Sequence, residues 1–326
     1  MINDKEFLKF EEGFFKPYFE KFIEFKRGKG EKVAHSTMVR LRKLNNSLNT
    51  YYEHHISDQM VEELLAPRDG LSELERQYLT ANLRQFCSFL ALLGIDAVIV
   101  PRKYMRTVKS EFRPYIFSDD ELRRLTIAAD TLPASRKSSS HQQIYPVLVR
   151  LLIGTGMRIG EVLALKRANV DTSNGVINVI NGKNGVSRFI PVSDSLKEVL
   201  FDYAKTIDMS DENRPFFTSS YTGGHLTYDA MKYMFPKMFK TAGIHKSDGK
   251  TPNIHSIRHT FCTKSLEKML ENGMNVYTAI PILAAYVGHV NYIDTEKYIH
   301  FTEQGHTDFL QKESSLGSLF PEVDNE

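Results

Sequence analysis

Six residues beyond position 150 of this 326-residue chain have side chains suited to chemistry at a phosphate group. They are Arg158, Lys183, His255, Arg258, His289 and Tyr298. Arginine stays charged at any working pH, and two arginines can hold both non-bridging oxygens of a phosphate. Lysine and histidine can move protons, and tyrosine supplies a hydroxyl that can attack phosphorus. Together these side chains could cut a phosphodiester bond without a metal ion.

Each of the six lies in a turn or at an expected helix end. Arg158 follows the sequence Gly-Thr-Gly-Met and precedes an apolar helical pattern, and Lys183 lies in the turn Asn-Gly-Lys-Asn-Gly. That turn separates two β-branched runs, 176–180 and 186–192, which predicts a hairpin with a glycine-rich tip. His255 and Arg258 are three residues apart at the start of a predicted helix, which places them on one helix face.

In this order, with these local sequences, the residues resemble the tyrosine recombinase (phage integrase) family, whose signature is Arg, Lys, His-x-x-Arg, His and Tyr. The resemblance covers roughly residues 114 to 303. It implies that Arg158 and Arg258 clamp the phosphate at which DNA is cut. It also implies that Lys183 donates a proton to the leaving 5′ oxygen. Lys197 and Lys205, on a helix downstream, are poorer candidates for that role.

The same resemblance assigns the remaining roles. His255 would handle a proton or orient the phosphate, and His289 would hydrogen-bond the phosphate. Tyr298, nine residues after His289, would be the nucleophile that forms a 3′-phosphotyrosine and releases a 5′ hydroxyl. The resemblance implies no metal and no cofactor, and religation from such an ester needs no ATP.

Three nearby residues compete with these assignments. Tyr286 and Tyr292 are alternative nucleophiles, but Thr295 is a plausible N-cap that would place Tyr298 in the first turns of a short exposed helix. His259 lies four residues after His255, a spacing that two metal ligands could use, but no third ligand accompanies them. His259 has no role in the family signature, so we expect it to be structural.

The composition is that of an ordinary soluble protein, with 41% hydrophobic and 25% charged residues. No apolar run reaches the ~18 residues that span a bilayer, and the N-terminus has no signal-peptide pattern. Cys87 and Cys262 lie far apart in helical patterns, which favours buried reduced thiols. A cytoplasmic, nucleoid-associated location is expected.

The net charge of +2 is too small to indicate nucleic-acid binding, so the distribution of charge matters more. Basic residues cluster in two regions, and such clusters are usually solvated faces. Because both flank a domain suited to phosphate chemistry, we expect contacts with the DNA backbone. The predicted DNA-binding residues are Arg40, Arg42, Lys43, Arg102, Lys103, Arg106 and Lys109.

The sequence predicts a mainly α, two-domain DNA clamp. Residues 1–100 would form a helical domain that binds the core site, 101–113 a basic linker, and 114–305 a mostly helical catalytic domain with a small antiparallel sheet. Residues 306–326 would form a polar tail, in which Leu316, Leu319 and Phe320 are apolar residues that could dock on a neighbouring protomer.

The predicted function is site-specific DNA recombination by a tetramer assembled on double-stranded DNA with specific core sites. Sister recombinases or accessory proteins are candidate partners, and a membrane is not. Two alternatives remain open. A type IB topoisomerase would use a similar set of residues to relax supercoils, and a catalytically silent DNA-binding accessory protein would keep only the fold.

Overall fold

The computed structural model describes residues 9–31, 33–51, 53–101, 114–133, 140–180, 182, 185, 187–219, 222–289, 295, 298 and 299. The chain forms two compact units, Met1–Phe112 and Arg113–Glu326. Among the described residues, no helix has the length and apolar character that crossing a bilayer requires. Lys183, most of the predicted linker and the predicted tail lie outside the described residues.

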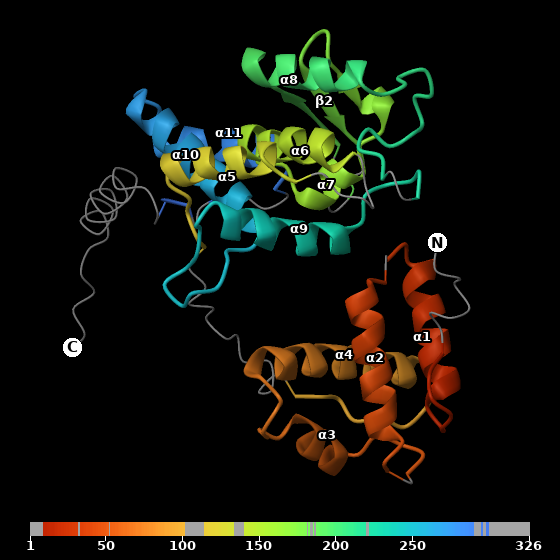
Figure 1. Cartoon of the computed structure of the whole chain (residues 1–326). Helices are drawn as coiled ribbons and strands as arrows, with labels where there is room; N and C mark the ends of the chain where they lie inside the picture. The colour runs from red at the N-terminus through yellow and green to blue at the C-terminus, as the bar shows by residue number, and fades with distance from the viewer. Residues whose placement is uncertain are drawn as a thin grey trace, which may run out of the picture. The chain divides into compact units, whose positions relative to one another are not determined.

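The N-terminal unit is built from α-helices (Figure 1). They are α1 (Lys16–Gly28), α2 (His35–Leu48), α3 (Asp58–Leu65) and α4 (Glu73–Leu92). Aromatic rings join α1 to α4, since Phe19 and Phe86 stack with their centroids 3.8 Å apart. A capping box starts α4: the Ser72 side chain accepts a hydrogen bond from the Glu75 backbone N–H, and the Glu75 side chain accepts one from the Ser72 backbone N–H.

The C-terminal unit is mostly helical, with one small sheet (Figure 1). Its helices are α5 (Asp119–Asp130), α6 (His141–Thr155), α7 (Ile159–Leu163), α8 (Asp194–Lys205), α9 (Tyr228–Thr241), α10 (His255–Glu271) and α11 (Val276–Val287), with a short 3₁₀ turn, η2 (Arg167–Asn169). Strands β1 (Val170–Asp171), β2 (Val176–Val179) and β3 (Arg188–Pro191) pair antiparallel in the order β1-β2-β3. The expected mainly α fold with a small antiparallel sheet is confirmed.

The predicted hairpin is formed by β2 and β3. Val176 pairs with Pro191 and Val179 with Arg188, so the two strands run antiparallel in this register. Ile177 and Ile190 face each other in this register and both are fully buried. Burial of these facing residues therefore fixes the register of the two strands.

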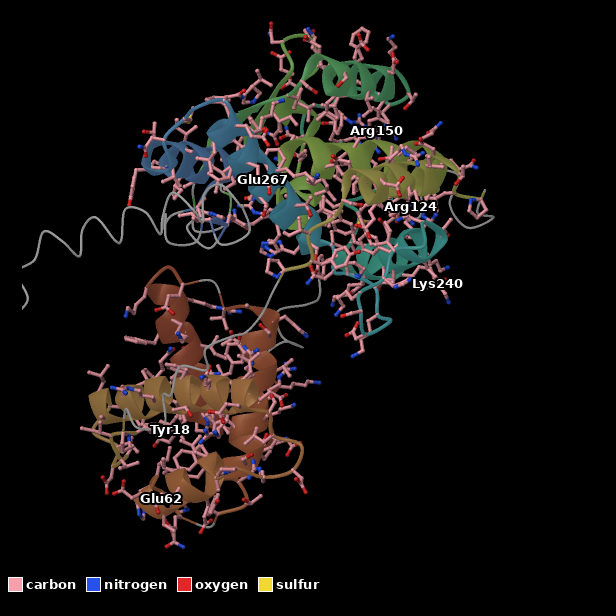
Figure 2. All side chains as sticks on the ribbon, turned by 90° about the vertical axis from the view of Figure 1, so that its left-hand side faces the viewer. Tyr18, Glu62, Arg124, Arg150, Lys240 and Glu267 are labelled. Atoms are coloured by element: carbon pink, nitrogen blue, oxygen red, sulfur yellow. The ribbon has the colours of Figure 1, made fainter. Side chains whose placement is uncertain are left out.

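Helix α6 forms the centre of the C-terminal unit. It packs against α5, α8 and α10, and it buries residues around most of its circumference. Both terminal nitrogens of Arg150 donate hydrogen bonds to the Asp130 carboxylate, at 2.6 and 2.7 Å. Arg124 of α5 donates a hydrogen bond to the carbonyl of Ala242 at the end of α9. Figure 2 labels both arginines. A helix that is apolar on most sides must lie inside a domain, and α6 does.

We expect Leu148→Ala in α6 to lower the free energy of unfolding by about 2–5 kcal/mol, because Leu148 is fully buried and the substitution leaves a cavity. Ile127→Ala on α5 is the control, since Ile127 is 47% exposed and its loss should have a much smaller effect. Urea denaturation of the full chain, followed by far-ultraviolet circular dichroism, measures both. Equal effects would show that α6 is not the centre of the core.

Candidate functional site

The turn between α6 and α7 places Arg158. Helix α6 ends on Gly156, which has φ +59° and lies so close to Phe261 that an added Cβ would be 2.3 Å from that ring. Only glycine fits this left-handed position without moving the ring. Arg158 then caps α7, and its backbone N–H donates to Glu161 Oε2 at 3.1 Å. The glycine motif therefore serves to start α7 at Arg158.

The Arg158 guanidinium lies at the edge of the site with 19% of its side chain exposed. It donates to Glu161 Oε1 at 3.0 Å and, from both terminal nitrogens, to the Gly288 carbonyl at 3.3 Å. An arginine three residues before a glutamate can be a surface ion pair or can clamp a phosphate. The pair with Glu161 exists, and the remaining exposure lets an anion reach the same guanidinium.

Arg258 is buried on α10, with 2% exposure. Its two terminal nitrogens donate to the carbonyls of Gly156 at 2.8 Å and Val287 at 2.7 Å. Burial, together with the neighbouring positive charge of Arg158, lowers the pKa of Arg258 to about 10. Two guanidiniums near each other repel, so an anion that contacts both would lower the electrostatic energy.

The end of α11 joins the two arginines. Val287 is the last residue of the helix, and Gly288 caps it in the left-handed region with φ +69°. The carbonyls of these two residues accept from Arg258 and Arg158 respectively. His289 follows directly, with its backbone N–H on the Ala284 carbonyl at 2.9 Å. Its Nδ1 lies 2.8 Å from Thr295 Oγ1, a hydrogen bond that orients the ring.

His255 is the first residue of α10 and is exposed, whereas Arg258 on the same helix is buried. Their spacing predicted one shared face, but α11 and the Gly156 turn cover Arg258 and leave His255 open to solvent. The His255 ring stands edge-on to that of His259, with the centroids 4.7 Å apart. Of the two histidines, His255 is therefore the one that a bound phosphate could reach.

The Tyr298 side chain is 1% exposed, so the expected exposed position is wrong. Its ring belongs to an apolar cluster between α10 and α11 that includes Leu266 and Leu283, and burial of the ring explains the difference. The hydroxyl lies 2.9 Å from His259 Nδ1. Burial raises the pKa of Tyr298 above its usual value, as does the adjacent Cys262 thiol.

The charges of Arg258 and Arg158 act in the opposite direction and lower the pKa of Tyr298. The Tyr298 ring also belongs to the same apolar cluster as Val287, whose carbonyl accepts from Arg258. The structure therefore brings Arg158, Arg258, His289 and Tyr298 together around the end of α11.

Three residues of the site were not singled out from the sequence as functional. His259 was taken as structural, but it is the hydrogen-bond partner of Tyr298. Glu161 and Arg188 are buried and form an ion pair beside Arg158, with Arg188 Nη2 and Glu161 Oε2 2.8 Å apart. The sequence signals for His259 were its position directly after Arg258 and its spacing of four residues from His255, and no signal indicated the partner of Arg188.

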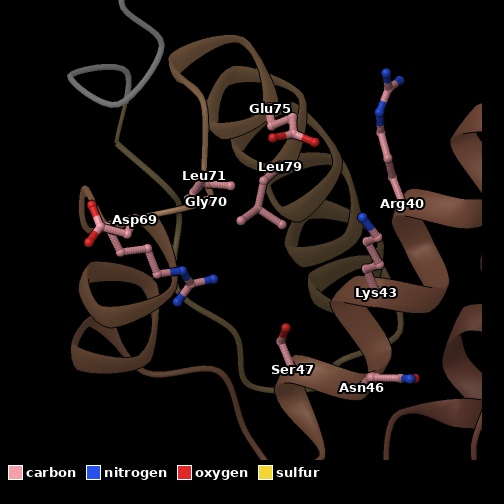
Figure 3. Close-up of a pocket in the computed structure, with 10 residues that line it drawn as sticks. Arg40, Lys43, Asn46, Ser47, Asp69, Gly70, Leu71, Glu75 and Leu79 are labelled. Carbon is pink, nitrogen blue, oxygen red and sulfur yellow. The ribbon is translucent and has the colours of Figure 1, made fainter.

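The predicted DNA-binding residues are described only in part. Figure 3 shows Arg40 and Lys43 of α2 beside a cavity of about 400 Å³ that Arg68, Asp69 and Glu75 also line. Arg40 stacks on Tyr78, with its guanidinium carbon 3.6 Å from the ring centroid. Arg42 lies on the same helix with its Nε buried, so it differs from the exposed Lys43. Residues 102–109 lie outside the described residues.

Comparison with known proteins places the chain in a family. The model of the phage integrase family matches residues 116–304, more than half of the chain. A Sinorhizobium fredii protein provisionally named integrase/recombinase y4rE is 32% identical over 67% of this chain and 69% of its own length. Tyrosine recombinase XerC of Staphylococcus saprophyticus is 27% identical over 69% of this chain and 70% of its own.

Solved structures share the fold. The XerH site-specific recombinase in a post-cleavage complex with its difH DNA aligns with a TM-score of 0.63 at 18% identity, over 86% of this chain and 78% of that one. The Tn1549 transposon integrase in complex with transposon right-end DNA aligns with a TM-score of 0.62 at 18% identity, over 91% and 99%. On the family match and the site, the chain belongs to the phage integrase family, the family of tyrosine-type site-specific DNA recombinases.

Proposed function

We propose that this protein cuts and rejoins duplex DNA at specific sites, with Tyr298 as the nucleophile. The observation that carries the proposal is the meeting of two guanidiniums and a phenol at one helix end. Arg158 and Arg258 donate to successive carbonyls at the end of α11, and Tyr298 belongs to the apolar cluster that includes Val287. A phosphate placed between the two arginines would be held where the phenol can approach it.

In the proposed cleavage step, the Tyr298 oxygen forms a bond to phosphorus and the bond from phosphorus to the 5′ oxygen breaks. The phenolic proton leaves to a base, and the 5′ oxygen takes a proton from Lys183. Arg158 and Arg258 neutralise the charge that develops on the non-bridging oxygens. Religation reverses each transfer, so the phosphotyrosine conserves the energy of the broken bond.

The position of Tyr298 supports a resting state that precedes this step. The hydroxyl is buried and bonded to His259, and burial raises its pKa, so ionisation is disfavoured there. Attack on phosphorus requires the hydroxyl to leave His259 and approach Arg158 and Arg258. We infer that binding of DNA and assembly of protomers bring about this movement.

The proposed substrate complex is a tetramer on double-stranded DNA with specific core sites, in which residues 306–326 dock on a neighbouring protomer. XerH and the Tn1549 integrase were solved with DNA, which supports DNA as the ligand here. Exposed Lys43 and the stacked Arg40 of α2 are cations that can contact the phosphate backbone from the N-terminal unit. Sister recombinases or DNA-bending proteins would complete the assembly.

We expect Tyr298→Phe to lower cleavage on the order of a thousandfold or more, because the attacking oxygen is removed while the ring that fills the apolar cluster is kept. Nicked duplexes from the DNA that flanks the gene serve as trapping substrates. The measurement is the covalent protein–DNA adduct on a denaturing gel, and the position of the cut in the DNA.

Tyr277→Phe is the control, since Tyr277 is 55% exposed on α11 and should leave the adduct intact. An adduct that persists in Tyr298→Phe but disappears in Tyr292→Phe would overturn the assignment of the nucleophile. Efficient relaxation of a plasmid that lacks the mapped site would instead indicate a topoisomerase.

We expect His259→Ala to release Tyr298 from its buried position, because the substitution removes the hydrogen bond to the phenol. A hydrogen bond contributes about 0.5–1.5 kcal/mol, so acetylation of Tyr298 by N-acetylimidazole without DNA should become about 2- to 10-fold faster. Mass spectrometry of the modified peptide measures this rate. His225→Ala is the control, since His225 bonds the Leu163 carbonyl elsewhere. An unchanged rate would mean that His259 does not hold the phenol.

A further inference from the structure

Arg188 makes contacts that link three parts of the site. It is the first residue of β3, and its side chain is 7% exposed. One terminal nitrogen donates to Glu161 Oε2 at 2.8 Å and the other to Glu161 Oε1 at 3.2 Å, while Nε donates to the Tyr286 carbonyl at 2.8 Å. Arg188 therefore forms a bidentate ion pair with the Glu161 carboxylate and a hydrogen bond to the last turn of α11.

The segments that Arg188 joins are those that carry the proposed catalytic groups. Glu161 lies three residues after Arg158, and Tyr286 lies three residues before His289. Arg188 itself follows Lys183 by five residues in the sequence. Because the Arg188 side chain is buried and each of its three guanidinium nitrogens donates a hydrogen bond, it orients other groups and does not itself bind DNA.

The charges of Glu161 and its two arginine partners also affect the site. Glu161 is the shared partner of two arginines, and its side chain is 6% exposed. Burial opposes ionisation of Glu161, but the hydrogen bonds and charge of Arg188, and then those of Arg158, hold its pKa below the usual value. One carboxylate therefore faces two guanidiniums, which leaves one net positive charge in the group.

The distances show how Glu161 divides its bonding. Arg188 contacts both carboxylate oxygens, whereas the Arg158 guanidinium contacts only Oε1, at 3.0 Å, and spends its other bonds on the Gly288 carbonyl. Without Arg188, the buried carboxylate would have Arg158 as its main cation and would draw that guanidinium away from a ligand.

The packing around Gly288 supports a fixed place for Arg188. A Cβ on Gly288 would lie 2.8 Å from Arg188 Nη1 and 3.0 Å from its Cζ. The end of α11 and the Arg188 guanidinium are thus in close contact, and the residue whose carbonyl holds Arg158 has no room for a side chain.

We propose that Arg188 is a positioning residue that neutralises Glu161 and so keeps the charge of Arg158 available to the phosphate at which DNA is cut. The proposal rests on the proposed function, in which Arg158 clamps that phosphate. It predicts that the effects of substituting Arg188 and Glu161 depend on each other when the preference for a charged over a neutral phosphate at the cleavage position is measured.

The experiment measures the preference for that charge. Two duplexes carry the mapped cleavage site, one with the normal phosphodiester and one with a neutral methylphosphonate at the cleavage position. The ratio of their dissociation constants is determined in full-length protein with Tyr298→Phe, so that no cutting occurs. Because hydrogen bonds to a charged group contribute strongly, the parent should bind the charged duplex about 10- to 100-fold more tightly.

Arg188→Gln should lose most of this preference, and Arg188→Gln combined with Glu161→Gln should regain it, because a neutral amide no longer captures Arg158. Arg150→Gln is the matched control, since Arg150 grips the carboxylate of Asp130 from both terminal nitrogens. It should leave the ratio unchanged. A merely structural role for Arg188 would shift the melting temperature and the binding of both duplexes equally.

An unchanged ratio in Arg188→Gln overturns the proposal, and so does an equal loss in the double variant. If Arg188→Gln does not fold, Glu161→Gln alone tests the proposal. Its preference for the charged duplex should be at least that of the parent, and a weaker preference overturns the proposal. Failure of the proposed function is distinct, because the parent would then show no preference for the charged duplex and the protein with Tyr298 would form no adduct.

Discussion

The site depends on two positive charges held side by side by main-chain oxygens. The last carbonyls of a helix have no partners within it, and the helix dipole makes that end negative. At the end of α11 those carbonyls accept from Arg258 and Arg158. Gly156 and Glu161 supply the other oxygens. Repulsion between the guanidiniums is thus offset by fixed groups, which do not have to rearrange when an anion arrives.

Tyr298 meets two demands that conflict in one position. Its ring is stabilised by burial among apolar side chains of α10 and α11, but a nucleophile needs access to phosphorus and a lowered pKa. In the structure the Tyr298 ring is buried, so the demand for apolar packing is met. The hydrogen bond to His259 helps to offset the cost of burying the Tyr298 hydroxyl.

The sequence predicted the local structure well where the signal was local. The β-branched runs on either side of an Asn-Gly turn predicted the hairpin that β2 and β3 form. The six proposed site residues came from the family resemblance, and of these Lys183 lies outside the described residues. The expected mainly α fold was right because helical periodicity is strong along the chain.

What could not be predicted were contacts between distant parts of the chain. His259 and Tyr298 are 39 residues apart, and Glu161 and Arg188 are 27 apart. Their partnerships depend on how α7, α10, α11 and the hairpin pack. The exposed position expected for Tyr298 was wrong for the same reason, since a short segment can be called exposed only when its neighbours are known.

Burial of the Tyr298 hydroxyl has a consequence for how unwanted DNA cleavage would be avoided. A recombinase that slides along a chromosome passes very many backbone linkages of the same chemistry as its target. With the proposed nucleophile Tyr298 buried, those encounters would leave the strands unbroken, so affinity for DNA alone would not cause damage. Accuracy then rests on the event that uncovers the hydroxyl, and sequence recognition needs only to make that event happen at the right place.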